Sequence, residues 1–299
     1  MHNTHVIIAL VFLMLLWISY LIPAFRHRWQ SALLSRNRLI GLSGLLVIGF
    51  LTLSSLHYMI GGEFRATRGG GVFLFARLCD YGIAQDYLKL QCPDSDYYLC
   101  QQKHSLGLGR HFLWDRKKVF HQQGGWTTQN EALYAQLCFD ILSHPNYLKK
   151  YLLKTTIATL NQFFCYDFSP LDENHHSKWL ANEVSRRFPD SMNEVQNSKQ
   201  YLGLYRPEMA DNKNNFQHLL ILFSLFIIGI HGFVSRWKFN RFWLFTGGLL
   251  FGLFLNALLS AATSGVYPRY QSRLAWMLTL PACWVVCQYV PTLWMSRKR

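Results

Sequence analysis

The chain of 299 residues is 51% hydrophobic and carries 30 Lys and Arg against 16 Asp and Glu, which gives a formal net charge of +14. Every acidic residue lies between Glu63 and Asp211, whereas the long apolar runs lie outside that stretch with only basic residues beside them. The basic excess therefore follows hydrophobic segments, as in a chain threaded through a bilayer, and is not the pattern of a nucleic-acid-binding protein. These features predict an all-α membrane protein.

Long apolar runs predict the transmembrane helices. A helix needs about 20 mostly apolar residues to cross a hydrocarbon core about 30 Å thick. Five segments meet this requirement: 6–22, 39–60, 216–234, 242–262 and 274–294. No Lys or Arg precedes the first of them and basic residues follow it, so we interpret it as an uncleaved span and not as a signal peptide. The predicted organisation is two spans in residues 1–60, a helical extracytoplasmic domain at 61–215, and three spans in 216–299.

Short basic segments predict the orientation of the chain. The linker between the first two spans, the linker between the third and fourth spans, and the C-terminal tail together hold ten basic residues and no acidic residue. Such segments stay in the cytoplasm, because translocating them is unfavourable. We therefore expect a bacterial inner-membrane protein with its N-terminus and the domain 61–215 in the periplasm and its C-terminus in the cytoplasm.

Glycine and proline positions divide the domain 61–215 into helices. Gly82 separates two short predicted helices over 73–90, and Pro189 separates another pair over 178–201. The glycines at 61–62 and 69–71 mark a flexible exit from the second span. Strand-like alternation of apolar and polar residues is scarce, so the domain is predicted to be helical.

The middle of this domain has the clearest helix signals. Thr128 and Glu131 fit a capping box, in which a hydroxyl and a carboxylate three residues later satisfy two free backbone amides. We expect a helix from here to His144, then a second helix that starts at Pro145, where the missing N–H of proline costs nothing, and ends near Tyr166.

Cysteines in the domain indicate a disulfide. Cys92 and Cys100 bracket a turn-rich stretch that contains Pro and Asp, so in an oxidising compartment we predict a bridge with Cα atoms about 4.4–6.8 Å apart. The alternative is a pair of buried free thiols. The sequence leaves the pairing of Cys79, Cys138 and Cys165 open. Because the chain has no CxxC pair, neither a zinc site nor a redox motif is predicted.

The outer end of the last predicted span holds the strongest candidate binding site. Arg269 and Arg273 are four residues apart and stack on one face if a helix begins at Pro268. Two guanidiniums beside Tyr267 and Tyr270 could bind a phosphate or pyrophosphate. The alternative is that these side chains are interfacial anchors, with Arg reaching toward lipid headgroups.

Other polar residues give weaker signals. Glu63, just outside the second span, and Asp80 could act as general bases, although most carboxylates in such positions only solvate a surface. The histidines lack metal-binding spacing and no nucleotide fingerprint is present, so neither a metal nor another cofactor is predicted. Ionisable residues are nearly absent from the predicted spans, which disfavours an ion or proton pathway.

Several short runs resemble stretches of uncharacterised bacterial multi-pass inner-membrane proteins. These runs are 73–83, 92–100, 112–115, 144–147 and 267–273. The layout is similar to the C-terminal part of the GT-C type glycosyltransferases that use lipid-linked sugars. In that family the catalytic acid lies in the first extracytoplasmic loop, but the corresponding segment here, residues 1–5, has no acid.

The resemblance and the basic site together predict a role in handling envelope saccharides or lipid-linked phosphates. The predicted ligands are membrane lipids and a lipid-linked sugar or phosphate. The competing hypothesis is a non-enzymatic scaffold or assembly protein that binds a protein partner through residues 61–215. Nothing in the sequence identifies the chain as an enzyme.

Overall fold

The structure is a computed structural model. It describes residues 4–23, 35–65, 67, 69–92, 98–101, 106–167, 182, 184–198, 201–202, 204, 207–238 and 240–296. Within these residues every regular element is a helix, as the sequence predicts, and no strand is present. Part of the basic linker after the first apolar helix, Arg26 and Arg28 included, and the tail 297–299 lie outside the described residues.

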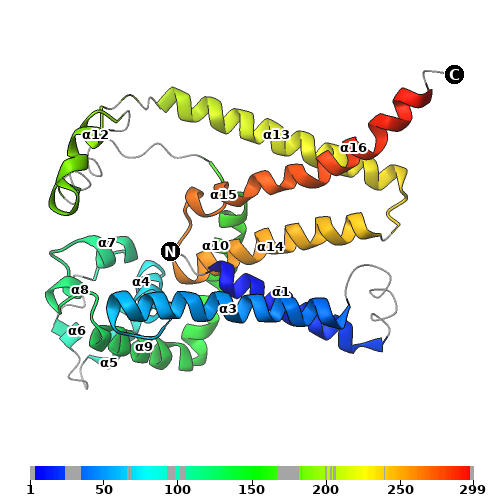
Figure 1. Cartoon of the computed structure of the whole chain (residues 1–299). Helices are drawn as coiled ribbons and strands as arrows, with labels where there is room; N and C mark the ends of the chain where they lie inside the picture. The colour runs from blue at the N-terminus through cyan, green and yellow to red at the C-terminus, as the bar shows by residue number, and fades with distance from the viewer. Residues whose placement is uncertain are drawn as a thin grey trace. The chain divides into compact units, whose positions relative to one another are not determined.

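The α-helices are α1 (Thr4–Leu21), α3 (Arg36–Gly61), α4 (Gly70–Asp80), α5 (Ile83–Gln91), α6 (Tyr98–Gln101), α7 (Gly109–Trp114), α8 (Val119–Gln122), α9 (Thr128–Ser143), α10 (Pro145–Phe164), α12 (Met192–Gln196), α13 (Pro207–Val234), α14 (Arg241–Thr263), α15 (Ser272–Ala275) and α16 (Thr279–Ser296) (Figure 1). Three short 3-10 helices are η1 (Pro189–Ser191), η2 (Pro268–Tyr270) and η3 (Trp276–Leu278).

Three of these helices are long and apolar enough to cross a membrane: Arg36–Gly61, Asp211–Val234 and Arg241–Thr263. They coincide with the second, third and fourth predicted spans. Only 11% of the most apolar window of the first helix is buried within the protein, so its side chains are available to contact lipid. The three helices support a membrane-embedded protein.

The first and fifth predicted spans differ from these three. The first is the shorter apolar helix α1, which lies beside α3 (Figure 1) and is joined to it by a hydrogen bond of 3.1 Å from Trp17 Nε1 to Ser43 Oγ. The fifth is not one continuous α-helix, because η3 interrupts it between α15 and α16. α16 is therefore the helix that continues the chain through most of this predicted span.

The chain forms two compact units, and each is made from separate pieces of sequence. One unit consists of Met1–Phe163 with Phe254–Val266, and the other of Phe164–Leu253 with Tyr267–Arg299. Residues of the predicted domain 61–215 contribute to both units.

The core of the first unit is aromatic and lies between α4, α7, α8 and α9. The rings of Phe75 and Tyr134 are 4.9 Å apart, and Phe112 lies within 5.5 Å of Phe75, Phe120 and Tyr134. All four side chains are fully buried. Aromatic pairs at this separation stabilise a core beyond the area they bury, so short helices can be held in fixed positions.

Glycines set the breaks and the closest contacts in this unit. Gly82, with φ of 69°, separates α4 from α5 as predicted, because a left-handed conformation favours glycine. Gly71 lets α4 approach α9 so closely that a Cβ there would lie 2.7 Å from the amide nitrogen of Ala135. The two helices are thus packed almost backbone to backbone.

The capping prediction for α9 is wrong by one residue. The N-cap is Thr127, whose hydroxyl accepts a hydrogen bond from the amide of Asn130. Thr128 instead donates to Glu63 at 2.6 Å, and Glu131 pairs with Arg65. Long-range partners therefore engage the two side chains that the local pattern assigned to the cap. The predicted helix boundaries at His144 and Pro145 are confirmed.

In the second unit, α13 packs against α16. A small apolar cluster joins Ile228 of α13 and Val285 of α16 to Phe242 of α14, and Tyr289 Oη lies 3.3 Å from Nδ1 of the buried His231. Among the described residues of the predicted helix pair 178–201, the helix 192–196 follows the break at Pro189.

Candidate functional site

The backbone around Arg269 differs from the predicted helix. Pro268 begins the 3-10 helix η2, and α15 begins separately at Ser272. The Gln271 amide donates to the carbonyl of Pro268, which is the bond of a 3-10 turn. Arg269 and Arg273 therefore do not stand on one continuous α-helix, so the condition for their predicted stacking at a spacing of four is not met.

Two tyrosine rings hold the Arg269 side chain. Its guanidinium carbon lies 5.2 Å from the ring centre of Tyr267 and 5.1 Å from that of Tyr270, within the range of a cation–π interaction. Arg269 Nη2 also donates to Tyr270 Oη at 3.2 Å. The two rings are perpendicular and 5.7 Å apart. The guanidinium is thus held in place while the Arg269 residue stays exposed.

The base of this site is anchored. Tyr270 is 6% exposed and Gln271 is 2% exposed, and the Gln271 side-chain amide donates to the carbonyl of Leu253 at 3.3 Å. Arg273 is exposed, and its carbonyl accepts a hydrogen bond of 2.8 Å from Trp276 Nε1. In the part of the chain that the structure describes, no carboxylate forms an ion pair with Arg269 or Arg273. Two exposed guanidiniums without an ion-pair partner among the described residues suit a phosphate-bearing ligand.

Glu63 is part of an ion-pair network that follows α3. Its carboxylate contacts Arg65 and accepts the hydroxyl hydrogen of Thr128, while Arg65 Nη1 donates to Glu131 at 2.5 Å. The network connects the segment after α3 to the first turn of α9, where a carboxylate is favoured by the helix dipole. The residue predicted as a general base thus has a structural role in tying these segments together.

Asp80 also has structural partners, one for each carboxylate oxygen. Its Oδ1 accepts the amide hydrogen of Gly109 at 2.6 Å, and its Oδ2 lies 3.3 Å from Arg77 Nη1. A Cβ at position 109 would lie 2.2 Å from the Ala76 carbonyl oxygen, so α7 begins against the backbone of α4. Asp80 therefore fixes the start of α7 and compensates Arg77.

Arg77 caps the C-terminal end of α14. The last carbonyls of any α-helix lack partners inside it, and here Arg77 Nε donates to the Ala261 carbonyl at 2.7 Å. Tyr151 Oη donates to the next carbonyl, that of Ala262, at 3.0 Å. Arg77 is only 7% exposed, and its other nitrogens donate to Asp80 and Tyr81. The positive group also complements the negative end of the helix dipole.

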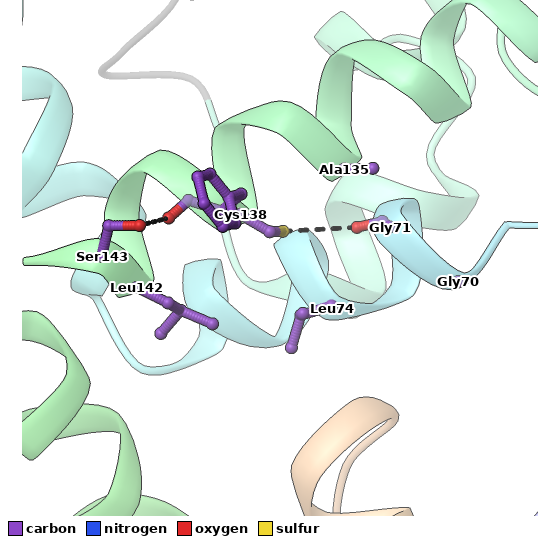
Figure 2. A pocket seen from close by; sticks show the side chains of 8 residues that line it. Gly70, Gly71, Leu74, Ala135, Cys138, Leu142 and Ser143 are labelled. Carbon is purple, nitrogen blue, oxygen red and sulfur yellow. Dashed lines mark hydrogen bonds between the residues drawn. The ribbon is translucent and has the colours of Figure 1, made fainter.

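A shallow apolar groove of about 410 Å³ lies between α4 and α9. Figure 2 shows Gly70, Gly71 and Leu74 on one side and Cys138, Leu142 and Ser143 on the other. Phe139 at its edge is 69% exposed. The groove has no convergent charged group, so its chemistry is that of an apolar contact surface.

The cysteines of the first unit are of two kinds, disulfide-bonded and free. Cys92 and Cys100 form a disulfide with Cα atoms 5.2 Å apart, the pairing that the sequence predicts. Cys79 and Cys138 are free and buried, and desolvation raises the pKa of both, in the case of Cys138 to about 12. Cys138 Sγ points to the Gly71 carbonyl at 3.5 Å (Figure 2). A thiol kept neutral in this way is a poor nucleophile.

Within the described residues no group of three or more His, Cys, Asp or Glu is placed to hold a metal ion. Sequence reasoning missed the structural role of Arg77. Arg77 acts on a carbonyl 184 positions away, and only spatial proximity reveals such a contact. The local signal for this role is that Arg77 lies three residues before Asp80 on an otherwise apolar helix, α4.

No protein-family model matches this chain, and neither a curated protein sequence nor a solved structure gives a significant match.

Proposed function

We propose that the protein is a bacterial inner-membrane protein that binds lipid-linked phosphates or saccharides through Arg269 and Arg273. The observation that carries this proposal is the exposed Arg269 guanidinium between Tyr267 and Tyr270. The site follows the C-terminal end of α14, a helix long and apolar enough to cross a membrane. Phosphate oxygens accept paired hydrogen bonds from a guanidinium, and tyrosine rings suit a sugar face.

The geometry favours binding over glycosyl transfer. Glu63 and Asp80, the acids proposed from the sequence, are held in ion pairs with Arg65 and Arg77. A general base must reach the proton that it removes, and both carboxylates have other partners. The proposed orientation has the N-terminus and this site in the periplasm and the C-terminus in the cytoplasm.

The test is ligand binding by the full-length protein in nanodiscs. The double variant Arg269→Gln/Arg273→Gln should lose most of its affinity for a polyprenyl phosphate, while its unfolding temperature stays close to that of the parent. The matched control is Arg236→Gln/Lys238→Gln, which removes the same charge at exposed positions before α14. Phosphatidylglycerol in place of the polyprenyl phosphate separates a general headgroup site from one for lipid-linked phosphates. Equal affinity of both double variants for both lipids would contradict the proposal.

A second function, as a scaffold for a protein partner, is favoured by the groove between α4 and α9. An apolar surface with an exposed ring such as Phe139 fits a partner helix or loop. Phe139→Ser should then abolish capture of a partner in membranes without changing lipid binding. Loss of lipid binding in this variant would instead indicate damage to the fold.

A further inference from the structure

In the second half of α10 the polar side chains are buried and large apolar side chains are exposed, as in a helix that contacts lipid. Thr155, Thr159 and Gln162 are 5%, 2% and 0% exposed. In contrast, Ile157 and Leu160 are each 54% exposed. A helix in water buries its apolar side chains and exposes its polar ones. In a bilayer the opposite arrangement is favoured, because lipid is as apolar as leucine and polar side chains mediate contacts between helices.

α10 also lies along the end of a predicted span. In its first half, Tyr151 Oη donates a hydrogen bond to the Ala262 carbonyl. At its end, the ring centre of Phe163 lies 6.5 Å from that of Phe254. As α10 advances from 151 to 163, its contacts on α14 move back from 262 to 254, so the helices are antiparallel. The eight positions of α14 from 254 to 262 correspond to about 12 Å at ~1.5 Å per residue.

The charges of α10 lie only in its first half. Lys149, Lys150 and Lys154 precede position 155, and no charged residue follows until Asp167. Lys150 pairs with Asp86, and Lys154 Nζ donates to the Tyr81 carbonyl at 2.8 Å. The uncharged residues 155–166 would span about 18 Å as a helix, which is too short to cross a hydrocarbon core about 30 Å thick.

We propose that the second half of α10 enters the bilayer beside α14 without crossing it, with Ile157 and Leu160 in contact with lipid acyl chains. The occupant of this apolar face is lipid, because α10 lies along α14, and α14 is long and apolar enough to cross the membrane. The lysines then lie at headgroup level and anchor the entry point. This inference does not rest on ligand binding by Arg269.

Depth-dependent fluorescence quenching tests the proposal in the full-length chain. Cys165, Cys283 and Cys287 are replaced by Ser, and an environment-sensitive label is placed on Leu160→Cys, Ile157→Cys or, as the control on the same helix, Lys149→Cys. In nanodiscs the labels at 157 and 160 should emit at shorter wavelength, be quenched by doxyl-labelled phosphatidylcholine and resist aqueous iodide. The label at 149 should show the reverse.

The unsubstituted protein provides a second measurement, in which no label affects the packing. Phospholipids with a photoreactive acyl chain should form adducts with the peptide 155–164, detected by mass spectrometry. Quenching by iodide at 157 and 160, or the absence of adducts, would place this face in water and overturn the proposal. Resistance to both quenchers together with a dimeric mass would assign the face to a second copy of the chain, which would also overturn it.

Discussion

At the scale of single residues, the feature that needs explanation is the buried Arg77. Burying a guanidinium is costly unless its donors are satisfied and a negative group compensates its charge. The Ala261 carbonyl, Asp80 and the Tyr81 hydroxyl meet this condition, and the Tyr81 ring lies 4.2 Å from the guanidinium carbon. Arg77 therefore stabilises two helices at once: α4, which carries it, and α14, whose carbonyl it caps.

Replacing Arg77 by Met should destabilise the protein by about 3 kcal/mol, since Asp80 is left partly buried without its cation and the α14 carbonyl loses a donor. Denaturant unfolding in detergent measures the change. The exposed Arg110→Met is the control and should change the free energy of unfolding by less than about 0.5 kcal/mol. The double variant Arg77→Met/Asp80→Asn should lose less than the sum of the single variants. Full additivity would contradict the pairing.

The buried Cys138 thiol makes the free energy of unfolding depend on pH. Because burial raises the pKa of the folded thiol from 9.0 to about 12, the unfolded chain loses its proton first as pH rises. Stability is therefore intact below about pH 9 and falls toward pH 12, by up to about 1.4 kcal/mol for each pH unit. Unfolding free energies at pH 8 to 11 should fall more steeply for the parent than for Cys138→Ala, in which the other titrating groups remain. Equal slopes would show that the thiol is not desolvated.

At the scale of elements, the contact between α4 and α9 depends on one glycine. Gly71→Ala would bring a methyl group within 2.8 Å of the Ala135 backbone, and overpacking of this kind costs about 2 kcal/mol. The neighbouring Gly70 has open space at its Cβ position, so Gly70→Ala should be neutral or stabilise by up to about 1 kcal/mol. Thermal unfolding of the two variants compares them directly. Similar stabilities would show that the helices can separate without cost.

Local patterns predicted much at this scale. The break at Gly82, the helix start at Pro145 and the disulfide between Cys92 and Cys100 each depend on residues close in sequence. The N-cap of α9 was misplaced because two adjacent threonines satisfy the same local rule, and only Glu63, 65 positions away, distinguishes Thr128 from Thr127. Likewise, periodicity identified α10 as a helix but not that its polar face is the buried one.

The candidate site was only partly predictable. Arg269, Tyr267 and Tyr270 are consecutive enough in sequence for their grouping to be recognised, and the structure places the two rings around the guanidinium. Their backbone geometry was not predictable from the proline alone, because Pro268 is compatible with the first turn of an α-helix and of a 3-10 helix. In the structure the turn is a 3-10 helix, and the buried Gln271 that follows it donates a side-chain hydrogen bond to the distant Leu253 carbonyl.

At the scale of the whole molecule, orientation is the property to measure. Lys117 and Lys238 are exposed and lie before and after α13, a helix suited to cross the membrane. A membrane-impermeant maleimide should label Lys117→Cys from the periplasmic side in intact cells and Lys238→Cys only after lysis, in a chain whose Cys165, Cys283 and Cys287 are replaced by Ser. Labelling of both positions from the same side would contradict a single crossing by α13.

The discontinuous first unit has a consequence for synthesis. Arg77 leaves the ribosome long before Ala261, the carbonyl of which it caps, and the intervening chain includes most of the other unit. Until residues 254–266 are in place, the nascent chain holds a charged side chain without its long-range partner. Completion of the first unit must therefore wait for insertion of α14. A chain truncated before α14 would lack these contacts of the first unit and would be more easily cleaved by proteases. Folding of the first unit therefore depends on assembly of the membrane helices.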